Sequence, residues 1–312
     1  MDNKKEVAKL KRKVSKWLKE WVINPYQEES LEESKADLLL YAEHKSPMIS
    51  EVDIRTIYFR HLIHYEHTRL NEGGNGHTDL ALAVRNAEAY IHFETAFSEA
   101  GKGGAVLQNE AVLYFSLAVI AGWKDATLQI GRALVRGLDT SLLDLRHTDR
   151  HRAGEMYRHF WFILHLYAQA GGPKFDTSLY SYPPDMTPYA NALDDWLTTD
   201  PNKVHDWICA MADFHVQETR NTADDEIDEF DAEDVMLFPY EILCWLRLRE
   251  WAGLETPKRF DHPLMQQPLA QRPEPVPLDV PATPLLDQVI ARFRQEFPDS
   301  FPGWVSPQGQ RT

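Results

Sequence analysis

The sequence predicts an all-α fold: an antiparallel array of helical hairpins with an N-terminal amphipathic helix and a proline-rich C-terminal arm. Apolar residues recur at helical spacing along most of the chain, and no pair of alternating segments indicates strands. Glycines and prolines divide this pattern into long segments joined by short breaks, which favours helices packed against their neighbours in sequence. With 312 residues, 43% of them hydrophobic, the chain can build a large core.

Residues 5–22 are predicted to form the N-terminal amphipathic helix. Its apolar residues recur at 3-4-3-4 spacing: Val7, Leu10, Val14, Trp17 and Trp21. Residues 1–22 carry eight basic and three acidic residues, a net charge of +5, which leaves −20 for the rest of a chain of net charge −15. The segment is expected to dock on the body or to pair with a copy of itself, so a homodimer is one alternative.

The next helices are delimited by capping residues. Ser30-Leu-Glu-Glu33 is typical of a capping box and predicts a helix from there to about Lys45. Ser50 is expected to cap a helix that runs to Leu70 and stops at the glycine-rich residues 73–76. Thr78 is expected to open a further helix that ends at Gly101.

The rest of the chain continues this pattern up to a proline-rich segment. Residues 107–121 and 124–137 are predicted to form a tight helical hairpin around Gly122-Trp123. Further helices are predicted at 148–170, 188–199, 201–220, 239–251 and 284–297. Residues 255–284 contain eight prolines and are expected to form an extended arm. We expect residues 1–49 to be a helical appendage and residues 50–312 to be the main domain.

The charge and composition exclude several classes of partner. A body of charge −20 should repel nucleic acid and lipid headgroups, so neither is expected to bind. No apolar run is long enough for a transmembrane helix, and the N-terminus lacks the apolar core of a signal peptide. Cys209 and Cys244 lack metal-ligand spacing. These observations predict a cytoplasmic protein whose electrostatic complement is a basic protein.

An acidic segment, residues 224–234, is the most distinctive local feature. It holds eight carboxylates without one intervening base: Asp224, Asp225, Glu226, Asp228, Glu229, Asp231, Glu233 and Asp234. Carboxylates at this density repel each other, so the segment is either a solvated loop that keeps the protein in solution or a clamp for a basic partner. The apolar run that follows is expected to anchor it, with Trp245 in the core and Arg247 and Arg249 at the edge.

Common catalytic motifs are missing, and no catalytic residue, metal or cofactor is predicted. The alternative is a metal-dependent phosphohydrolase of the HD type centred on His205 and Asp206, with His165 and Asp213 as further ligands. His151, Glu155 and His159 also lie on one helical stripe, as zinc or iron ligands could, but neighbouring arginines would oppose a cation.

The layout of the chain resembles the all-helical immunity proteins of bacterial polymorphic and type VI secretion toxin systems, in particular the immunity 49 family. The resemblance covers roughly Thr78 to Leu269. It includes the segments Trp196-Leu-Thr-Thr-Asp-Pro, Glu241…Trp251-Ala-Gly-Leu254 and His262-Pro-Leu-Met265. It implies a cytoplasmic antidote that binds a cognate toxin, often a nuclease, one to one and occludes its active site. A helical scaffold that dimerises through residues 5–22 is a further alternative.

Overall fold

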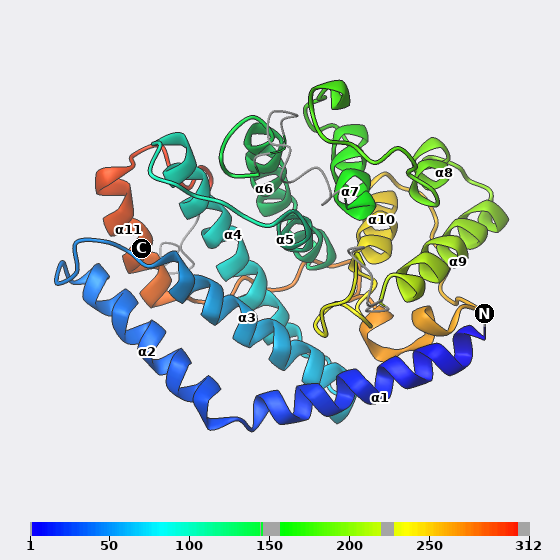
Figure 1. Ribbon diagram of the computed structural model, residues 1–312, viewed down its shortest axis with the longest axis horizontal. Helices are drawn as coiled ribbons and strands as arrows, with labels where there is room; N and C mark the ends of the chain where they lie inside the picture. The colour runs from blue at the N-terminus through cyan, green and yellow to red at the C-terminus, as the bar shows by residue number, and fades with distance from the viewer. Residues whose placement is uncertain (1, 144, 146–156, 220–227, 305–312) are drawn as a thin grey trace.

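The computed structural model describes residues 2–143, 145, 157–219 and 228–304 of the chain. Eleven α-helices and no β-strand lie within these residues, which confirms the predicted all-α class (Figure 1). Among the same residues, no helix combines the length and the apolar character needed to cross a membrane.

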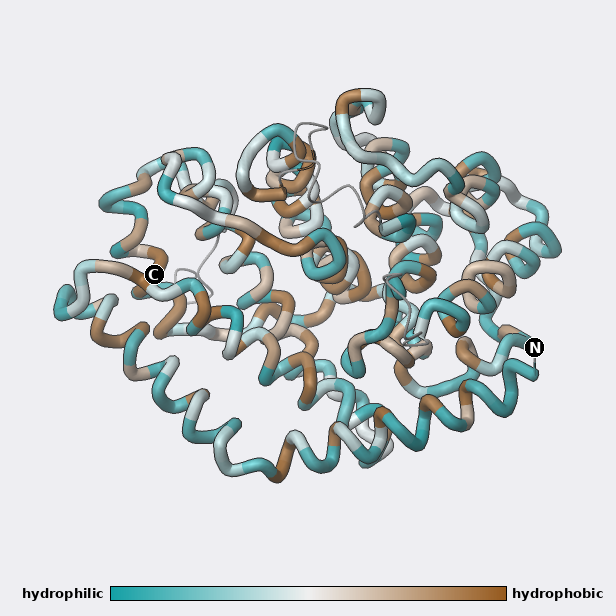
Figure 2. The backbone as a smooth tube through the Cα atoms, in the orientation of Figure 1, coloured by the Kyte–Doolittle hydropathy of each residue, from teal (hydrophilic) through white to brown (hydrophobic). Residues whose placement is uncertain are grey.

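Two helices at the N-terminus form an open V along one edge of the molecule (Figure 1). They are α1 (Asn3–Val22) and α2 (Pro25–Ala42), and both pack against α3 (Glu51–His67). In Figure 2, hydrophobic and hydrophilic residues alternate along both helices, as expected for elements with one buried stripe. Val7, Val14 and Leu18 of α1 are buried in the same hydrophobic core as the other helices, so the segment predicted as an appendage shares the core.

The capping box predicted at Ser30 is wrong, because α2 begins five residues earlier. Asn24 is the N-cap, its side-chain oxygen accepts a hydrogen bond from the Tyr26 amide at 3.1 Å, and Pro25 occupies the first helical position. Asparagine at the N-cap followed by proline at the first position is a strong helix start, so the helix was already formed at Ser30. The predicted stop after Leu70 is confirmed: α3 continues through a π-turn, Thr68–Glu72, and ends at Gly73, which has a φ of 74°.

The centre of the molecule is built from helices that are buried on all sides. They are α4 (His77–Glu99), α5 (Gln108–Ile120) and α10 (Tyr240–Trp251), and nearly every residue of α5 and α10 is shielded from solvent. Amphipathic helices surround them, including α6 (Lys124–Gly137) and α7 (Arg158–Gln169). Burial on every face is expected of helices in such a central position.

The two arginines of α10 were predicted at the edge of the helix, and this is wrong. Arg247 and Arg249 are 2% and 1% exposed. Arg249 donates hydrogen bonds to the carbonyls of Trp196 and Thr198, and Arg247 donates to the carbonyl of Pro273 at 2.6 Å. A guanidinium carries five donors, so it can be buried where backbone carbonyls receive them. The two side chains therefore attach two neighbouring loops to the core.

The remaining elements lie around this centre and pack against different helices. They are α8 (Tyr189–Asp194), α9 (Pro201–Gln217), α11 (Pro284–Glu296) and three short 3₁₀ turns, η2 (Thr177–Leu179), η3 (Pro263–Gln266) and η4 (Pro268–Ala270). The proline-rich arm contains η3 and η4 and then crosses to the turn between α5 and α6, where the Leu278 amide donates to the carbonyl of Ala121 at 2.9 Å.

The buried carboxyl group of Glu94 gives the fold a testable pH dependence. Glu94 lies on α4, is 3% exposed, and accepts a hydrogen bond from the Ala105 amide at 2.8 Å. Burial raises its pKa to about 7. The folded protein therefore holds the Glu94 proton more tightly than the unfolded chain does. As the pH rises from the ordinary pKa of a glutamate towards 7, the unfolded chain loses this proton first, and the folded state loses stability.

We therefore expect Glu94→Gln, which stays neutral, to become more stable relative to the parent as the pH rises from 5 to 8. The expected change in the difference in unfolding free energy is roughly 2 kcal/mol. Urea unfolding at both pH values measures the difference. Glu99→Gln, which removes a carboxylate from the surface of the same helix, is the control. A Glu94→Gln advantage of the same size at both pH values would contradict this origin.

Candidate functional site

The structure separates the predicted acidic residues into different environments. Asp224, Asp225 and Glu226 lie outside the described residues. Of the others, Asp231 is exposed, Glu229 is buried, and three are half-buried: Asp228, Glu233 and Asp234. The described part of the segment is therefore not a uniform row of solvated carboxylates.

Glu229 caps the start of α7. Its carboxylate accepts hydrogen bonds from the amides of Arg158 and His159, both at 2.9 Å, and from His159 Nδ1 at 2.7 Å. The Arg158 guanidinium lies 3.3 Å from the same carboxylate. Amides at a helix N-terminus lack partners within the helix and carry partial positive charge, so a carboxylate there is stabilising. Glu229 is thus an internal cap, and nothing within the sequence segment itself indicated this partner on a distant helix.

Aromatic stacking continues this attachment into the core. Phe230 packs between the rings of His159 and His215, with centroid separations of 4.8 and 4.0 Å. His215 Nδ1 lies 2.9 Å from a carboxylate oxygen of Glu241, and both side chains are fully buried. The start of the described acidic segment is therefore held against α7, α9 and α10.

The other end of the acidic segment contacts α1. Lys13 Nζ lies 3.1 Å from a carboxylate oxygen of Glu233, so a base of this chain already balances one acidic residue. Burial raises the pKa of Asp234 to about 6. Burial, and secondarily the Asp234 carboxylate, raises the pKa of Glu66 well above its ordinary value. Among the acidic residues in the described part of the segment, Asp231 is the one that is exposed.

The residues of the phosphohydrolase hypothesis do not converge as predicted. His205 Nε2 lies 3.6 Å from Cys209 Sγ and 3.7 Å from a carboxylate oxygen of Asp261. Asp213 contacts His262, and His165 contacts the Tyr182 hydroxyl at 3.1 Å. Within the described ranges, no three His, Cys, Asp or Glu side chains form a group that could hold a metal ion.

The His151, Glu155 and His159 stripe lies only partly within the described residues. His151 and Glu155 lie outside the described residues. The third member, His159, is fully buried and directs Nδ1 to Glu229.

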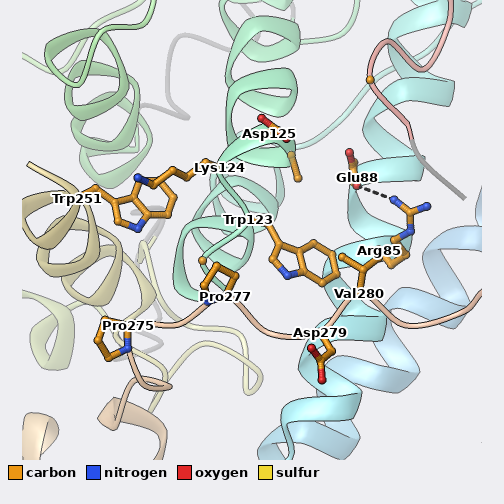
Figure 3. Close-up of a pocket in the computed structure, with 13 residues that line it drawn as sticks. Arg85, Glu88, Trp123, Lys124, Asp125, Trp251, Pro275, Pro277, Asp279 and Val280 are labelled. Atoms are coloured by element: carbon orange, nitrogen blue, oxygen red, sulfur yellow. Dashed lines mark hydrogen bonds and ion pairs between the residues drawn. The ribbon is translucent and has the colours of Figure 1, made fainter. Parts of the chain in front are cut away.

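A pocket of about 920 Å³ lies between the α5–α6 turn, α4 and the proline-rich arm (Figure 3). The indoles of Trp123 and Trp251 line it, together with Pro275, Pro277 and Val280. Its charged lining residues are Arg85, Glu88, Lys124, Asp125 and Asp279. A pocket of this volume, with aromatic walls and charged groups that converge on it, is a candidate site for a small ligand.

Specific contacts give the pocket its shape. Gly122 has a φ of 83°, and a Cβ atom at this position would lie 2.9 Å from the Cα of Pro277. The Trp123 indole donates a hydrogen bond to the carbonyl of Leu278 at 2.8 Å. Glycine at the turn therefore lets the arm approach, and the indole holds it there, so the pocket is formed before any ligand binds.

The electrostatics of the pocket are set by a buried ion pair. Arg85 and Glu88 are 4% and 5% exposed, with 3.4 Å between their charged groups, and the Arg85 guanidinium stacks on Trp304. Burial raises the pKa of Glu88 to about 7 against the opposing charge of Arg85. The sequence predicts the turn at Gly122-Trp123 but not this pocket. Its residues come from segments almost 200 positions apart.

Comparison of the chain with known proteins finds no matching family model, no matching curated protein and no matching solved structure.

Proposed function

We propose that this protein is an immunity protein of the cytoplasm, which binds a basic toxin, such as a nuclease effector, and neutralises it by covering its active-site surface. The observation that supports the proposal is the charge of the body outside residues 1–22, which is −20. A nuclease needs a basic surface to hold phosphates, and an acidic protein competes for that surface and is steered towards it.

The part of the acidic segment around Glu229 is well suited to present charge to such a partner. Glu229 is fixed to α7, and Phe230 is inserted between two histidines, while Asp231 emerges at the surface directly afterwards. A carboxylate on a fixed backbone loses less conformational freedom on binding than one on a free loop, which increases affinity.

The basic helix α1 restricts where a basic partner can bind. All of its basic side chains are exposed: Lys4, Lys5, Lys9, Lys11, Arg12, Lys13, Lys16 and Lys19. They would repel a cationic surface, so the partner is expected to approach the acidic segment from the side away from α1. The apolar stripe of α1 packs on the core of its own chain. For this reason we do not propose a homodimer through that stripe.

Neutralising the acidic segment should slow capture of the toxin. The variant carries Asp224→Asn, Asp225→Asn, Glu226→Gln, Asp228→Asn and Asp231→Asn, and it keeps Glu229 because that side chain is a helix cap. We expect its association rate with the basic toxin encoded beside it to fall by about tenfold at low salt and to depend less on salt. Stopped-flow fluorescence between 20 and 500 mM NaCl measures both effects.

The control carries the same change in net charge at another place. It replaces five exposed carboxylates on or directly after α2: Glu29, Glu32, Glu33, Asp37 and Glu43. If this control slows association as much as the first variant, only the net charge matters and the acidic segment has no special role. If neither variant differs from the parent at low salt, electrostatic capture is wrong.

A further inference from the structure

The pocket between the α5–α6 turn and the proline-rich arm offers a second recognition site, separate from the acidic segment. We propose that it binds an aliphatic ammonium group, such as an amine of a polyamine, between the indoles of Trp123 and Trp251 and the carboxylates of Asp125 and Asp279. Three features support this proposal: the aromatic walls, the distribution of charge and an existing ammonium contact in the pocket.

The two indoles are the first support. They line opposite parts of the pocket in Figure 3, with prolines of the arm between them. The Nζ atom of Lys124 already lies 5.3 Å from the centroid of the Trp251 ring. The ring therefore already attracts an ammonium group of this chain, because its face is electron-rich, and a ligand ammonium would take the place of Lys124 there.

The lining carboxylates are the second support. Three carboxyl groups line the pocket, against two bases. The Arg85 guanidinium forms ion pairs with the carboxylates of Glu88 and, at 3.7 Å, Asp287. The carboxylates of Asp125 and Asp279 are exposed and come from α6 and the arm, on different sides of the pocket. A ligand with separated ammonium groups can therefore contact both while its methylene chain covers the apolar wall.

Glu88 at the end of the pocket adds a dependence on pH. Burial raises its pKa to about 7, and a bound cation favours the ionised form. The charged groups that face it are Arg85 on α4, Lys124 and Asp125 on α6, and Asp279 on the arm. Because a cation binds more strongly to the ionised pocket, affinity should rise from pH 6 to pH 8, and Glu88→Gln should reduce this rise.

Titration calorimetry of the full chain with spermidine at pH 8 and low salt tests the proposal. We expect one site per chain and at least a tenfold weaker affinity for the double variant Asp125→Asn, Asp279→Asn. Trp251→Leu should weaken binding roughly fivefold, since it removes one aromatic wall. The control, Glu29→Gln with Glu33→Gln, removes the same two charges from α2 and should bind as the parent does.

A second titration, with a lysine-rich peptide, distinguishes the sources of the ammonium group. Spermidine binding without peptide binding identifies a site for free polyamines, whereas peptide binding that the double variant weakens identifies a site that accepts lysine side chains of a protein. Equal affinity of the parent, the double variant and the α2 control for both probes would show non-specific attraction to an acidic protein and overturn the proposal. Failure of this test leaves the toxin-capture experiment unaffected, because the two use different residues.

Discussion

Trp245→Ala is expected to lower the free energy of unfolding by about 3–5 kcal/mol. Trp245 lies in the middle of α10, is fully buried and has the Arg249 guanidinium 5.1 Å from its ring centroid. Removing the indole leaves a large cavity beside a helix that is enclosed on all sides, where neighbouring helices cannot easily move in to fill it. Within the described residues the indole nitrogen has no hydrogen-bond partner, so the loss arises from packing and from the Arg249 contact and not from a broken hydrogen bond.

Urea unfolding followed by circular dichroism measures this change, together with the melting temperature. Tyr26→Ala is the matched control, because Tyr26 is 74% exposed and its loss should change stability by less than about 0.5 kcal/mol. A Trp245→Ala protein that melts with the parent would mean that α10 is not part of the core.

The contrast between α10 and the acidic segment shows what could be predicted from the sequence. The apolar run 238–251 contains enough bulky side chains to predict a core helix, and Trp245 is buried as expected. The prediction that Arg247 and Arg249 lie at the edge of the helix is wrong, because it follows the general rule that charged residues lie at a surface. Their acceptors, the carbonyls of Trp196 and Pro273, lie about 50 and 25 positions away, and local spacing carries no information about them.

The same limit applies to both candidate sites. From the sequence, the eight carboxylates of the acidic segment look equivalent, because all are acidic and close together. The fold distinguishes them through partners on other elements, such as α7 for Glu229 and Lys13 for Glu233. The pocket needs α4, the α5–α6 turn and the arm to meet, and only the turn at Gly122-Trp123 could be recognised locally.

Among the acidic residues of the segment, Glu229 is expected to contribute most to stability. We expect Glu229→Ala to cost about 3–5 kcal/mol of stability, because it leaves the buried His159 ring and two amides at the start of α7 without their acceptor. Asp231→Ala, two residues further along the same acidic segment, should cost less than about 0.5 kcal/mol because that side chain is exposed.

Urea unfolding of both variants gives the comparison, and hydrogen exchange gives a local readout. In Glu229→Ala the amides of Arg158 and His159 should exchange faster than in the parent, even under conditions where the whole protein remains folded, whereas in Asp231→Ala they should not. Equal stability losses in the two variants would mean that the carboxylates act through their summed charge. A loss confined to Glu229→Ala would establish that one acidic residue of the segment maintains the fold, which leaves the exposed Asp231 available to a partner.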